Sequence, residues 1–152
     1  MLIPPAMRTF VQGPVLMTLA TRDSVNRPMI ARGVGLRPVG PATLRLAFCL
    51  RLWPETLANL LDNGWLALTV VQPTDYRAFQ FKGRARIAAA GPEDEADAML
   101  YRERTRQMLC GHGVAEEQLA SWLEAREIAM ADLEVERIFE QTPGPRAGMV
   151  IL

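Results

Sequence analysis

The residues best suited to bind a ligand are two arginines that enclose a glycine-rich stretch, Arg32-Gly-Val-Gly-Leu-Arg37. Glycine inside a strand usually marks a bulge or a close approach of another group to the backbone. One interpretation is therefore a bulged barrel corner with solvated arginines, an arrangement that is common at barrel rims. The other is a planar ligand that lies on bare backbone, with the arginines at its anionic end.

Strand alternation predicts which of these side chains share a face. In an ideal strand over Met29–Arg37, Arg32 shares its face with larger side chains, whereas Arg37 lies on a face that is almost bare. The first face carries Ile30, Arg32, Val34 and Leu36, and the second carries Ala31, Gly33, Gly35 and Arg37. The two arginines would then reach one ligand only if the strand bulges or twists, which the glycines permit.

Other reactive residue types are sparse. His112 is the only histidine and stands between two glycines, where an exposed loop residue is the ordinary interpretation and an axial haem ligand the alternative. Cys49 and Cys110 are far apart, and no Ser-His-Asp arrangement or cluster of metal ligands is visible. We therefore predict neither catalytic residues nor metal ligands. Any redox chemistry would have to be that of a cofactor.

The composition is that of an ordinary globular protein, with 49% hydrophobic and 22% charged residues. Its 152 residues suit a single domain, residues 1–152. Seventeen basic and seventeen acidic residues cancel, which argues against nucleic acid as a partner and leaves self-association unopposed. We find no apolar run of the roughly 18 residues that span a bilayer and no signal peptide. Two separated cysteines are typical of a cytoplasmic protein, so we expect that location and no membrane partner.

Strand patterns dominate residues 13–90, the expected core of the domain. Val15–Ala20 is apolar on nearly every side, which predicts burial on both faces or a core on one face and a subunit on the other. Thr43–Leu50 alternates between apolar and other residues. The expected elements are the strands Val15–Ala20, Met29–Arg37 and Thr43–Leu50, the short helix Pro54–Asp62, and the strands Trp65–Val71 and Tyr76–Ile87.

The long strand Tyr76–Ile87 has one apolar face and one polar row. The polar row consists of Gln80, Lys82, Arg84 and Arg86. Such a row is more typical of a solvated sheet face than of a phosphate site.

Helical patterns follow in residues 93–126. Acidic residues open a first helix that runs from Glu93 to about Leu109, and a second is expected over residues 115–126. Tyr101 and its neighbouring arginines, Arg102, Arg104 and Arg106, have the spacing of a solvated basic helix face. The last segment, residues 127–152, contains the strand Ile128–Phe139 and an apolar tail, Met149–Leu152, that we expect to dock on its own subunit or on a neighbour.

Four short motifs in this order resemble the pyridoxamine 5'-phosphate oxidase-like proteins, the FMN-binding split β-barrel family. They are Leu19-Ala20-Thr21 with Arg27-Pro28, Asn59-Leu60 with Asn63, Leu66-Ala67-Leu68-Thr69-Val70, and Lys82-Gly83-Arg84-Ala85. The resemblance covers about half of the chain. It implies a mainly β fold, a six-stranded antiparallel split β-barrel with a short helix after the third strand and a helical segment before the last strand.

The resemblance also implies a homodimer, a small-molecule ligand and FMN as cofactor. Family members hold FMN with an Arg-x-x-x-x-Lys stretch in the second strand, and Arg32 and Arg37 match that spacing. Many members also carry Ser-Arg-Lys at the start of the short helix, where this chain has Pro54-Glu55-Thr56. Arg51 is the candidate substitute for the missing cations. The FMN site so predicted comprises Arg32, Gly33, Val34, Gly35, Leu36, Arg37, Arg51, Trp53 and Thr56.

Two functions from different classes follow from these observations. The first is an FMN-dependent oxidoreductase that acts on an unknown small molecule, favoured by Arg32, Arg37 and the glycines between them. It would not be a true pyridoxamine 5'-phosphate oxidase, because Ala78 replaces the glutamine that holds the flavin in the oxidases. The second is a non-catalytic binding or sensing barrel with weak or no FMN, or with haem or a deazaflavin, favoured by Pro54-Glu55-Thr56.

Overall fold

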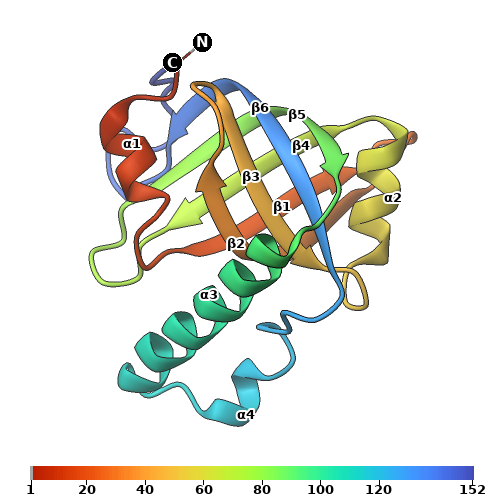
Figure 1. Ribbon diagram of the computed structural model, residues 1–152. Coiled ribbons are helices and arrows are strands. Elements are labelled where there is room, and N and C mark those ends of the chain that lie inside the picture. Colours follow the sequence, from red (N-terminus) through yellow and green to blue (C-terminus); the bar gives the residue numbers. More distant parts are fainter. Residues whose placement is uncertain (1) are drawn as a thin grey trace.

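The computed structural model describes residues 2–152 and confirms a six-stranded antiparallel barrel (Figure 1). The strands close in the order β1-β2-β3-β6-β5-β4. Their bounds are β1 Leu16–Arg22, β2 Pro28–Pro38, β3 Thr43–Cys49, β4 Trp65–Val71, β5 Ala78–Ala88 and β6 Ile128–Glu140. Among these residues no helix combines the length and the apolar character that crossing a membrane requires.

Four helices surround the barrel, α1 Pro5–Phe10, α2 Pro54–Asp62, α3 Pro92–Gly111 and α4 Glu116–Leu119. Figure 1 shows α1 and α2 at opposite ends of the barrel and α3 alongside it, with α4 beyond. Both α1 and α2 begin with proline, which suits the first turn because its missing N–H would have no partner there. The helix expected over residues 115–126 is thus reduced to the single turn of α4.

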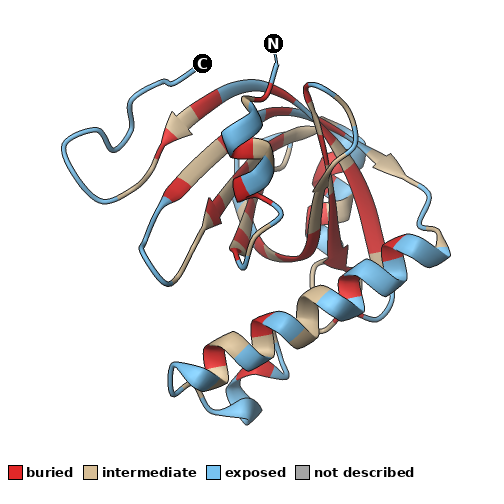
Figure 2. Cartoon of the chain, turned by 60° about the vertical axis from the view of Figure 1, so that its left-hand side comes forward, coloured by how far each residue is buried: buried red, intermediate tan, exposed pale blue. Residues whose placement is uncertain are grey.

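The core fills the barrel interior, since alternate residues of every strand point inward. Figure 2 shows the buried residues concentrated on the strands, whereas much of α3 is exposed. The strand β1 shows how the two faces differ: Met17 and Leu19 are buried inside, and Leu16 packs outside against the cluster formed by α3 and α4. The outward apolar side chain of Leu16 is therefore covered by this chain's own helices.

The C-terminal tail docks on its own subunit. Residues 148–152 run beside the end of β6, with Ile151 N–H donating to the Ile138 carbonyl over 2.8 Å and Glu140 N–H donating to the Met149 carbonyl over 2.9 Å. On that edge of β6, β3 pairs only with residues 128–134. The tail therefore occupies part of the edge that β3 leaves free. Its apolar side chains, Met149 to Leu152, remain 37–60% exposed.

Candidate functional site

The glycine-rich stretch of β2 contains a bulge. Gly33 pairs with Phe48 of β3, and Gly35 pairs with the next residue, Ala47, so that Val34 is the extra residue. Gly33 points into the barrel, where a Cβ atom would lie 3.1 Å from the Cβ of Met17. Val34 keeps the outer face that it was expected to share with Arg32, so the expected alternation through this strand is wrong only from Gly35 onward.

The bulge brings Arg32 and Arg37 to the same, outer face of the barrel. Leu36 pairs with the buried Leu46 and points inward, whereas Arg37 pairs with Arg45 on the outside. This outcome agrees with the condition derived from the sequence, because the strand bulges between the two arginines.

The helix α3 covers the bulged backbone. Val34 and Ala47 form a buried cluster with Ala98 of α3 and with Met130 of β6. A Cβ atom on Gly35 would lie 3.9 Å from the Cα of Ala98. The backbone that we expected to lie against a planar ligand is thus covered by a helix of the same chain.

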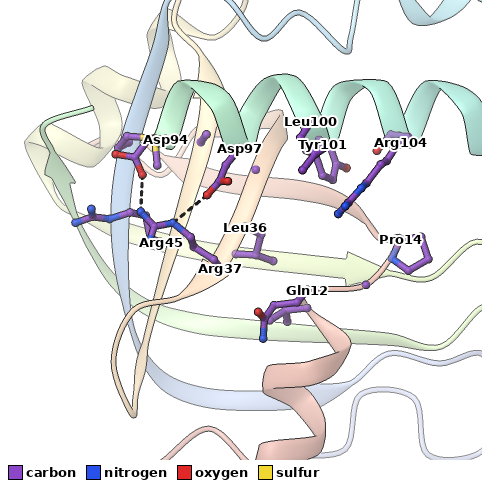
Figure 3. A pocket seen from close by; sticks show the side chains of 16 residues that line it. Gln12, Pro14, Leu36, Arg37, Arg45, Asp94, Asp97, Leu100, Tyr101 and Arg104 are labelled. Carbon is purple, nitrogen blue, oxygen red and sulfur yellow. Dashed lines mark hydrogen bonds and ion pairs between the residues drawn. The ribbon is translucent and has the colours of Figure 1, made fainter. Parts of the chain in front are cut away.

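A pocket of about 380 Å³ remains between α3, the outer faces of β2 and β3, and the linker between α1 and β1 (Figure 3). We call it the α3 pocket. Its apolar wall includes Leu100 and Met130, and its polar side includes three arginines, Arg37, Arg45 and Arg104. Val11 and Leu36, which pack on the barrel core, also line it. The remaining lining residues are Gln12, Gly13, Pro14, Gly35, Ala47, Asp94, Asp97, Tyr101 and Thr105.

Carboxylates hold two of the three arginines. Arg37 donates to Asp94 over 2.7 Å and lies 3.4 Å from Asp97, and Arg45 forms two hydrogen bonds with Asp132 over 2.7 and 2.8 Å. Within residues 2–152, Arg104 forms no ion pair. The Arg104 side chain points from α3 toward the pocket (Figure 3). It is therefore the cation in this pocket that is available to an anion.

Asp94 is a buried carboxylate at the first turn of α3. Burial on its own would raise the pKa of Asp94, but hydrogen bonds from Arg37 and from the Gly91 N–H outweigh it and leave the pKa below its ordinary value. Tyr101 holds the same helix further along, since its hydroxyl donates to the Val15 carbonyl over 2.8 Å. Burial raises the pKa of Tyr101 to about 12, so the hydroxyl stays protonated and keeps this bond.

The other residues of the predicted FMN site lie elsewhere. The guanidinium of Arg32 stacks on the ring of Trp122 at 4.4 Å, and Arg51 is mostly exposed and lies 3.3 Å from Glu124. Trp53 packs against the barrel core, and Thr56 is fully buried, with a hydroxyl that has no hydrogen-bond partner among residues 2–152. Of the nine predicted residues, only Gly35, Leu36 and Arg37 line the α3 pocket.

Sequence reasoning missed Arg45, Asp94 and Arg104 as site residues. Arg45 lies on the outward face of an alternating strand, and Asp94 opens a helix, so each had an ordinary explanation. Arg104 was assigned to a solvated basic face, but it lines the pocket. His112 follows the end of α3, outside this pocket, and residues 2–152 contain no cluster of His, Cys, Asp or Glu able to hold a metal ion.

Comparisons with known proteins identify the family of this chain. The family model described as pyridoxamine 5'-phosphate oxidase matches residues 3–140. No curated protein matches the sequence.

Several solved structures share the fold. The HupZ protein of Group A Streptococcus is 24% identical, with 96% of this chain and 99% of that chain covered and a TM-score of 0.60. An F420 reductase is 14% identical, with 90% and 98% covered and a TM-score of 0.56. General Stress Protein 26 of Bacillus anthracis is 14% identical, with 86% and 87% covered and a TM-score of 0.51. At these identities the similarity concerns the fold alone.

Proposed function

Because the chain belongs to the pyridoxamine 5'-phosphate oxidase family, we propose that it binds a small organic anion, and that the α3 pocket is the site. The observation that carries this proposal is the position of Arg104, a cation without an ion-pair partner in residues 2–152, in a pocket whose apolar lining includes Leu100 and Met130. The pocket volume, about 380 Å³, lies within the range of small-molecule sites. A carboxylate or phosphate would pair with Arg104 while the apolar part of the ligand packs on the wall.

The residues predicted to bind FMN, the cofactor that the family implies, do not together form one FMN-binding site. Thr56 has no access to a ligand because it is fully buried, and Glu55 carries negative charge at the helix start where a phosphate would lie. The bulged backbone is covered by Ala98, and Arg37 is already paired with Asp94. The residues present therefore support no redox step through FMN. The histidine that a haem site would use, His112, is also outside the α3 pocket.

The proposal is tested by titrating FMN and pyridoxal 5'-phosphate, two flat phosphate-bearing molecules of different size, into the wild type and Arg104→Gln, with binding read by NMR at the Gly35 and Leu100 backbone amides of the α3 pocket. We expect the smaller probe to bind more tightly and Arg104→Gln to weaken it about tenfold or more, because a charge-assisted hydrogen bond is lost. Arg102→Gln is the matched control, since Arg102 belongs to the same helix but does not line the pocket.

Either of two results would contradict this prediction. One is that neither probe binds at about 1 mM, and the other is that Arg102→Gln and Arg104→Gln weaken binding equally. A purified protein that is yellow and retains flavin absorption after dialysis would instead establish FMN as the ligand.

We also propose that the chain forms a homodimer. The zero formal charge offers no long-range repulsion, and the exposed apolar side chains from Met149 to Leu152 lie together on the docked tail. Light scattering at micromolar concentration should give about twice the 16.9 kDa of the chain. A mass equal to that of one chain would contradict the proposal.

A further inference from the structure

A second pocket, of about 490 Å³, lies on the outer face of four neighbouring strands and shares no lining residue with the α3 pocket. We call it the outer-face pocket. Four residues stand side by side across these strands: Ala20 of β1, Ala67 of β4, Lys82 of β5 and Arg137 of β6. The other lining residues are Thr21, Arg22, Trp65, Leu66, Gly83 and Glu136. The pocket thus combines a floor of small side chains with a cationic side.

The cations of this pocket are not neutralised by the chain itself. Lys82 and Arg137 stand directly opposite each other on adjacent strands, an arrangement that like charges disfavour. Within residues 2–152 neither they nor Arg22 forms an ion pair, and the Lys82 ammonium instead lies 4.6 Å from the centre of the Phe139 ring. Glu136 is the one carboxylate that lines the pocket. Three cations and one carboxylate leave a surplus of two positive charges.

A bulge positions these groups. Lys82 pairs with Arg137, but Gly83 pairs with Val135, so that Glu136 is the extra residue of β6 and stands beside Arg137 at the pocket. On the other side, Trp65 forms a flat wall, and the Arg84 guanidinium stacks on its ring at 3.8 Å. The small floor of Ala20 and Ala67 lies between this aromatic wall and the cations.

From this arrangement we propose that the outer-face pocket binds a small organic phosphate with a flat ring. The ring lies on Ala20 and Ala67 beside Trp65, and the phosphate lies between Lys82 and Arg137, within reach of Arg22. A phosphomonoester carries a charge of about −1.5 to −2 at pH 7, which matches the surplus of two positive charges. The α3 pocket differs, because carboxylates pair with Arg37 and Arg45 there and, in the described part of the chain, leave only Arg104 of its three arginines unpaired.

From the sequence alone, Lys82 belongs to a polar row that is typical of a solvated sheet face. The structure adds what a single strand cannot show, the cations Arg22 and Arg137 that the neighbouring strands bring to the same place. This second site is independent of the function proposed for the α3 pocket.

Adenosine 5'-monophosphate is a suitable probe, since it combines a flat ring with one phosphate. In titrations of the full chain followed by NMR, we expect shifts at the Trp65 indole N–H and at the Ala20 and Ala67 backbone amides. Lys82→Gln and Arg137→Gln should each weaken binding about tenfold or more. Arg86→Gln, on the same strand but outside the pocket, and Arg104→Gln, in the α3 pocket, should leave the affinity read from the Trp65, Ala20 and Ala67 signals unchanged. Adenosine without the phosphate should bind far more weakly.

Three results would overturn the proposal. The probe could fail to bind at about 5 mM, or Arg86→Gln could weaken binding as much as Lys82→Gln does. The third result concerns a second copy of the chain as the occupant. If Ala67→Trp, which fills the floor, converts a dimer into a monomer and leaves binding of the probe unchanged, the face is a subunit interface and not a ligand site.

Discussion

Gly83→Ala should destabilise the protein by about 3 kcal/mol or more, which for a domain of this length corresponds to a fall in Tm of roughly 6–12 °C. A Cβ atom on Gly83 would lie 1.9 Å from the carbonyl oxygen of Glu134 and 3.1 Å from the backbone nitrogen of Glu136. Both are main-chain atoms of β6, so no side-chain rotation relieves the overlap. The two strands must separate at the bulge, where Gly83 and Val135 pair.

Gly111→Ala is the matched control for this prediction. Gly111 is the last residue of α3, and a Cβ atom there would meet no neighbour within 4 Å. Alanine favours a helix over glycine, so this variant should be as stable as the wild type or slightly more stable. Thermal unfolding of the three proteins measures the difference. A Gly83→Ala protein that melts within about 2 °C of the wild type would show that the bulge tolerates a side chain.

The barrel was predictable from the sequence, because alternation reports which residues face a core. Thr43–Leu50 illustrates this, since Leu44, Leu46 and Phe48 are all completely buried, as the alternating pattern predicts. The second helix was not predictable in the same way. The apolar spacing of Leu119 and Leu123 suits one face of a helix, and both are buried against Leu109, but only residues up to Leu119 are helical. Apolar spacing reports burial and not the conformation between the buried residues.

The candidate site was predictable only in part, because the register between strands is a tertiary property. The glycines of β2 indicated a bulge, but which residue is inserted depends on the pairing with β3, and that pairing decides that Arg37 stands opposite Arg45. The contact between Arg37 and Asp94 joins residues 57 positions apart. Nothing local to either residue shows that the arginine expected to bind a ligand holds a helix.

That contact leads to the second large effect, which concerns the attachment of α3. Asp94→Ala should destabilise the protein by about 2–3 kcal/mol, because it removes a charge-assisted hydrogen bond and leaves Arg37 without its shortest contact. It also removes the acceptor for the Gly91 N–H at the start of the helix. The Asp94 side chain is only 6% exposed, so water replaces these bonds poorly.

Asp97→Ala is the control, since the Asp97 side chain is 56% exposed and lies 3.4 Å from the same arginine. Exposed pairs contribute about 0–1 kcal/mol, so this variant should change stability little. Trypsin reports on the helix itself, because α3 contains Arg102, Arg104 and Arg106. Cleavage at these arginines should be faster in Asp94→Ala than in Asp97→Ala. Equal rates in the two variants would mean that Asp94 does not hold α3.

The pH dependence of Asp94→Asn separates the charge of Asp94 from its shape. The folded pKa of Asp94 is lowered: burial opposes the lowering, but the hydrogen bonds from Arg37 and Gly91 outweigh it. The carboxylate therefore stabilises the fold fully above the ordinary pKa of 3.8, and this contribution is lost as the pH falls through the lowered folded value. In urea unfolding, the stability difference between the wild type and Asp94→Asn should be constant from about pH 7 to pH 5 and should shrink as the pH falls below about 4. A difference that stays constant down to about pH 2 would show that the carboxylate charge is not what attaches the helix.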